Sequence, residues 1–362
     1  MFGRRVCERL ARLPNLHIFL AGRDGGRADA MASAIARAEG TTVVGLAFDK
    51  QNKLAEGLKA LDPRLVIDAS GPFQGADHRI ARACIEQKRH YLDLADDPTF
   101  VKSLWDLDTP AQLAGVLAVS GASSTPGLSS AVAGRLVRDF SHVDAISVGI
   151  TPGNRAPRGL AVIRSILSYV GRPIHTWKDG APAHVTGWHD IKRISLSGLG
   201  PRWFSACDTP DALLFPRHFK GVRNVSFHAG LELGFLHLGL WLLSWLVVWG
   251  VVRNLAPLAP LALKMTGLVE SLGTDRGGMF VQVVGMDKQG KRKAKRWTLI
   301  AGSGHGPYVP ALASVVLTRK LLDGSLTQRG AKPCLELFSI EEFLEAAADL
   351  DITTHLDEVS LP

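Results

Sequence analysis

Apolar positions in the first 130 residues follow two alternating patterns. Short apolar runs have the length of buried strands and lie at 16–21, 41–48, 65–69, 91–95 and 116–120. The segments around them carry apolar residues at helical spacing, as at Val6, Leu10 and Leu13, or are rich in alanine, as at 26–39. Strands that alternate with helices of about 10–15 residues are typical of a parallel, doubly wound α/β sheet.

The pattern changes near residue 140. Strand-like segments separated by Gly/Pro-rich turns now dominate, at 143–150, 191–197, 223–230, 279–286 and 296–302. A hairpin turn is expected over 286–291, and helices over 310–322 and 340–349. We therefore predict a first α/β domain over 1–138 and a second, α+β domain with a mostly antiparallel sheet over 139–304.

The twenty residues 233–252 carry no formal charge. Trp241, Trp245 and Trp249 lie four apart on one helical face of this segment. Three alternatives stay open: a buried or oligomer-interface helix, a helix lying in a membrane interface, and a bilayer span. The strands expected on both sides argue against the span, because it would divide one sheet across a membrane.

Composition excludes several classes of protein. With 46% apolar residues the chain is globular. Its net charge of +8 favours anionic partners. The basic run 288–296 is best explained as a solvated hairpin tip, because Trp297 is the one aromatic residue beside it and nucleic-acid binding calls for interleaved aromatics.

The four cysteines are widely spaced and form no CxxC pair, which predicts neither a metal site nor disulfides. Residues 1–20 lack the apolar run of a signal peptide. We expect reduced thiols in a cytoplasmic protein, with a peripheral membrane position left open by 233–252.

The first helix and the second strand suggest a dinucleotide site. In the G-x-G-x-x-G fingerprint the third glycine lets the helix pack closely on the sheet, a position that Gly3 fits. About 20 residues after a first glycine, the second strand of an NAD enzyme usually ends in an acidic residue. Here the strand ends in Ala21-Gly22-Arg23, which leaves room for a 2′-phosphate and a guanidinium to bind it, so the sequence favours NADP. The alternative is that Arg23 caps a loop.

Two later loops extend this site. Asp49 follows the next strand and is a candidate to reach the adenine. Ser70-Gly71-Pro72-Phe73 forms a tight turn at the carboxyl edge of the sheet, where loops face the dinucleotide.

Several segments, in order, resemble the saccharopine dehydrogenase-like NADP-binding oxidoreductases. They are 21–23 (AGR), 69–74 (ASGPFQ), 90–94 (HYLDL), 121–127 (GASSTPG), 273–279 (GTDRGGM) and 302–307 (GSGHGP). The resemblance spans nearly the whole chain. It implies that the last part, 305–362, returns as helices that pack on the first domain.

The start departs from that family pattern. The family begins with a strand and a glycine loop, and this chain has neither ahead of Gly3. The missing strand would be central in the order 3-2-1-4-5-6, and unpaired buried backbone groups cost about 1–3 kcal/mol each. We expect either a start upstream of Met1 or a product that folds and binds cofactor poorly.

Hydride transfer needs a proton donor near the nicotinamide. Tyr91 and Asp93, on one face of a strand near its carboxyl end, and His305, in a glycine-rich turn, are the candidate catalytic residues. The alternative is structural, with Tyr91 packed under a loop and Asp93 capping the next segment.

The sequence thus predicts an NADP-dependent oxidoreductase with a small amino-acid-like or lipid-linked substrate. Two alternatives remain: a catalytically silent protein that binds a membrane or a partner, and an NADP sensor without turnover. The apolar helix also makes a homodimer an open possibility.

Overall fold

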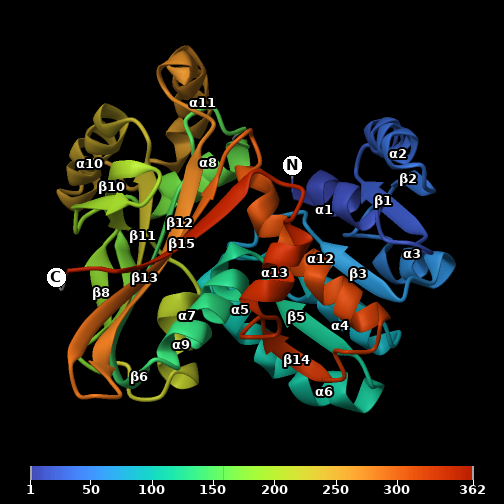
Figure 1. Ribbon diagram of the computed structural model, residues 1–362. Coiled ribbons are helices and arrows are strands. Elements are labelled where there is room, and N and C mark those ends of the chain that lie inside the picture. The colour runs from blue at the N-terminus through green and yellow to red at the C-terminus, as the bar shows by residue number, and fades with distance from the viewer. Residues whose placement is uncertain (1, 158, 361–362) are drawn as a thin grey trace.

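The apolar runs of the first 120 residues form parallel strands in the computed structural model, which describes residues 2–157 and 159–360 (Figure 1). The strands are β1 (Ile18–Gly22), β2 (Val43–Ala47), β3 (Leu65–Asp68), β4 (His90–Asp93) and β5 (Leu117–Ser120). The helices are α1 (Phe2–Leu10), α2 (Gly25–Glu39), α3 (Leu54–Leu61), α4 (Arg79–Glu86), α5 (Pro98–Ser103), the 3-10 turn η1 (Leu104–Leu107) and α6 (Asp108–Ala114).

These strands form two hydrogen-bonded pieces. β1 pairs with β2, and β3, β4 and β5 follow one another in a second piece that ends in β14 (Gly330–Pro333), all parallel. Ile18 of β1 and Ile67 of β3 pack against the same apolar cluster under α1. The order is therefore that of a Rossmann-type sheet, divided between β1 and β3. The strand expected ahead of residue 1 stays a prediction.

The second sheet is larger and mostly antiparallel, as predicted. Its strands are β6 (Phe140–Thr151), β7 (Pro173–Lys178), β8 (Ala181–Thr186), β9 (Lys192–Leu196), β10 (Gly200–Ala206), β11 (Asn224–Leu231), β12 (Gly277–Asp287), β13 (Arg292–Ala301) and β15 (Ile352–Glu358). The main order is β15-β13-β12-β6-β11-β10-β9, with β7 and β8 attached to β11. The pair β6–β11 is parallel, and the hairpin β12–β13 turns where the sequence predicts it.

Helices cover the second sheet and connect it to the first. They are η2 (Ser124–Leu128), α7 (Ser129–Val137), α8 (Leu160–Tyr169), α9 (Asp211–His218), α10 (Gly234–Val248), η3 (Ala256–Leu258), α11 (Ala259–Leu268) and η4 (Glu270–Leu272). In Figure 1, α10 and α11 lie at the outer end of this domain, away from α2 and α6.

The last part of the chain returns to the first domain and then leaves it. The segments η5 (Gly306–Tyr308), α12 (Val309–Leu322) and α13 (Ile340–Ala346) precede the final strand. α12 places Ala311 and Val315 against Val6 and Leu10 of α1. β15 instead pairs with β13, so the expectation of helices throughout 305–362 misses an edge strand of the second sheet.

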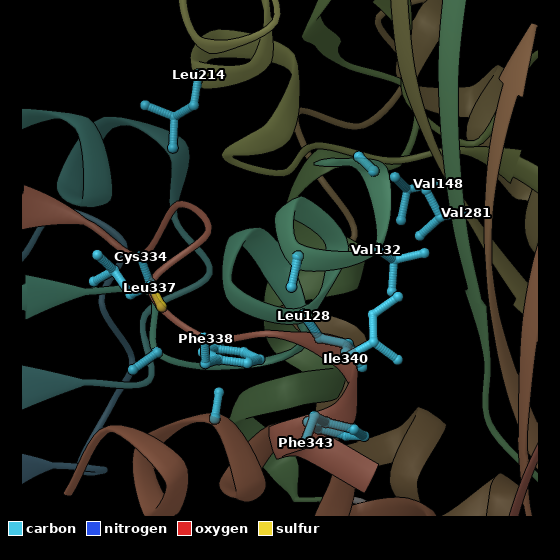
Figure 2. Close-up of a cluster of buried hydrophobic side chains, with 14 of the residues drawn as sticks. Leu128, Val132, Val148, Leu214, Val281, Cys334, Leu337, Phe338, Ile340 and Phe343 are labelled. Carbon is cyan, nitrogen blue, oxygen red and sulfur yellow. The ribbon is translucent and has the colours of Figure 1, made fainter. Parts of the chain in front are cut away.

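One continuous core joins the two domains. In Figure 2, Leu128 and Val132, from η2 and α7, lie between the loop of Cys334 and the strands that carry Val148 and Val281. The same cluster includes Leu92 and Val119 from the parallel sheet. Shared burial of this kind fixes the two sheets relative to each other, so that a site between them has defined geometry.

The apolar segment 233–252 is not a core helix. α10 leaves Phe235, Leu242 and Trp249 exposed by 56%, 61% and 70%. Within the described residues, no helix combines the length and the hydropathy that crossing a bilayer requires.

Candidate functional site

The carboxyl edge of the parallel sheet carries most of the predicted cofactor residues. Gly22 ends β1, and Arg23 follows it with an exposed side chain. Asp24 caps the N-terminus of α2: its Oδ1 accepts a hydrogen bond from the Arg27 backbone N–H at 3.0 Å. The Arg23 guanidinium therefore lies beside a strand end without a large side chain, and arginine can bind a phosphate through two hydrogen bonds.

The small residues here let a helix approach the sheet closely. A Cβ added at Gly45 would lie 2.2 Å from Cα of Asp29 in α2, and one at Gly25 would lie 3.0 Å from Cβ of Ala47. A Cβ at Gly3 would lie 3.4 Å from Cβ of Ala69. The first turn of α1 thus lies next to the end of β3, and helix N-termini favour phosphate groups.

Ser70 connects this edge to a second cation. Its hydroxyl donates to the Asp68 carboxylate and accepts from Lys50 Nζ at 2.7 Å. Asp24, Asp49 and Asp68 accept hydrogen bonds from their own loops. Lys50, Arg23 and the first turn of α1 are the groups at this edge that would attract a phosphate. These residues fit a phosphate-bearing dinucleotide, which would lie along the edge.

The remaining predicted cofactor residues stabilise the loops in which they lie. The Asp49 carboxylate accepts from the backbone of Gln51 at 2.9 Å and from the Asn52 amide at 2.8 Å, which closes its own turn. Gly71 and Pro72 form the turn after β3, and Phe73 is buried with its ring centroid 5.2 Å from that of Phe100. The Phe73 ring thus anchors the turn and does not face the cofactor edge.

Tyr91 and Asp93 point to one side of β4, as expected, but both are buried. Tyr91 is 1% exposed and Asp93 is 0% exposed. Asp93 Oδ1 accepts from the backbone N–H groups of Ala95 and Gly121 and from the Ser120 hydroxyl, at 2.8–3.0 Å. Burial raises the pKa of Asp93 to about 7. The geometry matches the structural alternative, because neither side chain reaches a surface where substrate could bind.

His305 lies elsewhere. Its Nδ1 accepts from the Asp351 backbone N–H at 2.8 Å, and its ring lies 5.9 Å from that of Tyr308. With Glu8 and Asp349 it lines a pocket of about 320 Å³ beside α1. The structure thus brings Tyr91 and Asp93 together and places His305 with a different group of residues.

A polar cluster that the sequence analysis did not assign lies where the two domains meet. Gln74, just after the Gly71-Pro72-Phe73 turn, directs its Nε2 to Ser165 Oγ at 3.0 Å and to Tyr169 OH and Asp96 Oδ1 at 3.4 Å. Ser165 and Tyr169 belong to α8 of the second domain, whereas Asp96 follows β4. Four side chains from both domains thus converge at the carboxyl end of the parallel sheet.

His175, Cys207 and Asp208 extend this cluster from the second domain. His175 Nδ1 lies 3.4 Å from Asp208 Oδ2, with the His175 side chain 43% exposed. Cys207 and Asp208 act electrostatically on Tyr169: after the larger effect of burial, both raise its pKa. We call Gln74, Asp96, Ser165, Tyr169, His175, Cys207 and Asp208 the interdomain cluster.

Two carboxyl groups of the interdomain cluster are destabilised in their charged form. Desolvation is the largest cause of the raised pKa of Asp96, whose side chain is nevertheless exposed to solvent. Desolvation also raises the pKa of Asp208, and the charge of Asp97 raises the pKa of both. Carboxyl groups with perturbed pKa values beside other polar side chains are typical of functional sites.

The sequence offers partial signals for this cluster. Gln74 directly follows the Gly71-Pro72-Phe73 turn, and Asp96 follows the predicted strand. Ser165, Tyr169 and His175 carry no local signal, because only the tertiary fold brings them near these residues. Among the described residues no group of three or more His, Cys, Asp or Glu side chains is placed to hold a metal ion.

Comparisons with known proteins agree with this architecture. Residues 1–119 match the family model of the saccharopine dehydrogenase NADP binding domain. No curated protein matches the chain significantly.

Among solved structures, apo saccharopine dehydrogenase (L-Glu forming) from Saccharomyces cerevisiae has a TM-score of 0.69 at 14% identity and covers 99% of this chain and 98% of its own. An NAD complex of GenD2 from gentamicin A biosynthesis has a TM-score of 0.41 at 13% identity, over 100% and 94% of the two chains. Amine dehydrogenase from Mycobacterium smegmatis has a TM-score of 0.44 at 8% identity, over 92% of each chain.

The match of residues 1–119 identifies a nicotinamide dinucleotide-binding domain, and the yeast structure shows the fold of the whole. Residues 1–119 therefore match the saccharopine dehydrogenase NADP binding domain, and the overall fold of the chain is similar to that of the yeast enzyme.

Proposed function

We propose that this protein is an NADP-dependent oxidoreductase that transfers a hydride to or from a small substrate carrying an amino group. One observation carries the proposal. The sheet edge with Arg23 and Lys50 continues, through the turn before Gln74, into the interdomain cluster. In this fold class, ligands bind outside the carboxyl ends of the parallel strands. A dinucleotide held along this edge would therefore extend its nicotinamide toward the interdomain cluster.

The amino group of the substrate follows from the charges of the cluster. Desolvation and the charge of Asp97 both disfavour the charged forms of Asp96 and Asp208. A substrate ammonium group would relieve both effects by pairing with the carboxylates. The name of the yeast neighbour, saccharopine dehydrogenase (L-Glu forming), also refers to an amino acid. These points favour an amino-acid-like substrate over a lipid-linked one.

Two residues are suited to act on such a substrate, one by exchanging a proton and the other by donating a hydrogen bond. His175 is half-exposed, and its Nδ1 faces Asp208, which would orient the ring. Tyr169 has a pKa raised by burial first and by nearby acidic groups second, so it stays protonated and can donate a hydrogen bond. The cofactor, when bound, supplies or accepts the hydride. We therefore assign His175 as the proton-exchanging residue in place of Tyr91, Asp93 and His305.

The proposal is tested on the full-length protein in two stages. NADPH and NADH binding is measured by fluorescence, and reduction of NADP is then followed at the nicotinamide absorbance band with a panel of L-amino acids and N-substituted amino acids. We expect tighter binding of NADPH and turnover of at least one amine. Binding without turnover of any panel member would favour the NADP sensor. Failure to bind either cofactor would overturn the enzyme proposal.

With a substrate in hand, Asp96→Asn should raise KM for the amine about tenfold, because an ammonium would lose a charged partner worth about 1.5 kcal/mol. KM for NADPH should stay unchanged. The matched control is Asp179→Asn, at an exposed hairpin turn whose left-handed backbone asparagine also adopts. Equal effects of the two substitutions would contradict the assignment of Asp96.

A further inference from the structure

α10 is apolar around its whole circumference apart from two polar residues. Its fully buried residues are polar: His237 Nε2 lies 2.8 Å from Ser205 Oγ, and Ser244 Oγ lies 2.9 Å from His189 Nε2. Burial lowers the pKa of His237 to about 4, so the imidazole is neutral inside the protein. Part of the apolar surface of the helix packs on the protein, but Phe235, Leu242, Leu243 and Val248 are exposed. A helix on the surface of a soluble protein ordinarily exposes polar residues instead.

The neighbouring helix in the sequence, α11, also exposes apolar residues. In α11, Ala259 is buried, whereas Leu261, Met265 and Leu268 are exposed by 55%, 54% and 83%. Both helices are held by one apolar cluster: Ile163 and Leu167 of α8, with Trp188, Leu255 and Ala259, pack beside Trp241 and Val247. We define the apolar face as the exposed residues Phe235, Leu242, Leu243, Val248, Trp249, Val251, Leu258, Leu261, Met265 and Leu268.

The charges within this segment have one sign. Residues 233–269 contain no aspartate and no glutamate, and their two charged residues are Arg253 and Lys264. Both side chains are exposed. Arg253 follows α10, and Lys264 lies within α11 among the apolar positions, whereas the exposed Glu270 comes directly after the segment. An apolar segment whose own charges are cations is complementary to a surface that is both apolar and negatively charged.

The tryptophans point to the same kind of surface. The ring centroids of Trp241 and Trp245 lie 6.1 Å apart, and those of Trp245 and Trp249 lie 5.6 Å apart. The series runs from half-buried Trp241 to Trp249, which is 70% exposed. Tryptophan is enriched where hydrocarbon meets headgroups, because its ring is apolar and its N–H is polar.

We propose that the apolar face docks on the surface of an anionic lipid bilayer, with its apolar side chains at the boundary of headgroups and acyl chains and with Arg253 and Lys264 on lipid phosphates. Contact of this kind needs no spanning helix. A second copy of the chain fits less well, because a symmetric dimer through this face would bring the same cations near each other. The proposal does not depend on the function proposed for the interdomain cluster.

The test is cosedimentation of the full-length protein with vesicles of phosphatidylcholine alone and of phosphatidylcholine with about 30% phosphatidylserine. Wild type should bind the anionic vesicles, and binding should weaken with salt. The double variant Leu242→Gln/Trp249→Ser should have an at least tenfold lower partition coefficient onto anionic vesicles, because two apolar side chains that would be buried in the membrane are removed. Arg253→Gln and Lys264→Gln should each lose about fivefold, on anionic vesicles only.

Leu113→Gln is the matched control, because Leu113 is 85% exposed but lies on α6 in the other domain. It should bind vesicles as wild type does, and all variants should keep the wild-type urea midpoint. If wild type binds neither vesicle, or if Leu113→Gln loses as much as Leu242→Gln/Trp249→Ser, the proposal is overturned. It is also overturned if sedimentation shows a dimer that the double variant abolishes while vesicles are not bound, since the face is then a contact between copies.

Discussion

Replacing Asp93 by alanine should destabilise the protein by about 3–5 kcal/mol. The Asp93 carboxylate is the acceptor for the backbone N–H groups of Ala95 and Gly121 and for the Ser120 hydroxyl, all in the interior. Alanine would leave these donors without an acceptor, and each buried unsatisfied group costs about 1–3 kcal/mol. The loop after β5 depends on this contact, so the variant should also lose order there. Urea unfolding followed by circular dichroism measures the change.

Two variants separate this role from a general effect of removing a carboxylate. Asp93→Asn keeps an oxygen acceptor and should cost less than Asp93→Ala. Asp97→Ala removes the cap of α5, where Oδ1 accepts from the Phe100 backbone N–H at 2.8 Å, and should cost about 1 kcal/mol. Equal costs for Asp93→Ala and Asp97→Ala would contradict the assignment.

The same carboxyl group should make stability depend on pH. Burial raises the pKa of Asp93 in the folded protein to about 7, from 3.8 in the unfolded chain. Between these values the folded state holds a proton that the unfolded state has lost. The contribution of Asp93 to the free energy of unfolding is therefore largest below about pH 4. It decreases as the pH rises to about 7 and is constant above that pH.

Asp93→Asn removes this titration. Between pH 5 and 6, the Asp93 carboxyl lowers the free energy of unfolding of wild type by about 1.4 kcal/mol for each pH unit. The variant should lack this decrease. Asp211 serves as an internal reference. Burial also raises its pKa to about 7, and it should continue to titrate in the variant. Identical slopes for wild type and Asp93→Asn would show that the carboxyl does not hold the proton.

Replacing Arg23 by alanine should weaken NADPH binding about 30–100-fold and leave NADH binding unchanged. Arg23 follows the Ala21-Gly22 tip of β1, and Asp24 beside it is committed to capping α2. A guanidinium that binds the 2′-phosphate through two hydrogen bonds contributes about 2–3 kcal/mol, whereas NADH has no such group. Isothermal calorimetry with both cofactors measures the ratio of the two dissociation constants.

Arg37→Ala is the control for Arg23→Ala, because Arg37 is an exposed arginine in the last turn of the same helix, α2. It removes the same charge at the far end of the helix and should change neither affinity by more than about twofold, as expected for a distant screened charge. A similar loss for both cofactors in Arg23→Ala would show that Arg23 supports the fold of the loop. No loss for either cofactor would remove the basis for NADP preference.

Local sequence determined the elements of this protein. Runs such as 65–69 and 116–120 are long enough to form strands and too short to form helices, and the glycine- and proline-containing turns between them fix where each element stops. The exposed Arg23 at the tip of β1 was also accessible from the sequence, because strand ends and the residues after them are local features. The sequence also shows that residues 233–252 are unusually apolar for a surface helix, because the segment has no charged residue.

Tertiary structure decided which side chains meet. Strand alternation places Tyr91 and Asp93 on one face, but only packing decides that this face is buried against α4 and α6, away from substrate. Gln74 and Asp208 are more than a hundred residues apart along the chain. They come near Tyr169 because the fold brings α8 and the segment after β10 to the loop after β3. Likewise, the sequence shows that α10 is apolar, but the side that faces the protein is the one carrying His237 and Ser244. Periodicity reports which residues share a face, whereas the partner of that face depends on contacts distant in sequence, which no local pattern encodes.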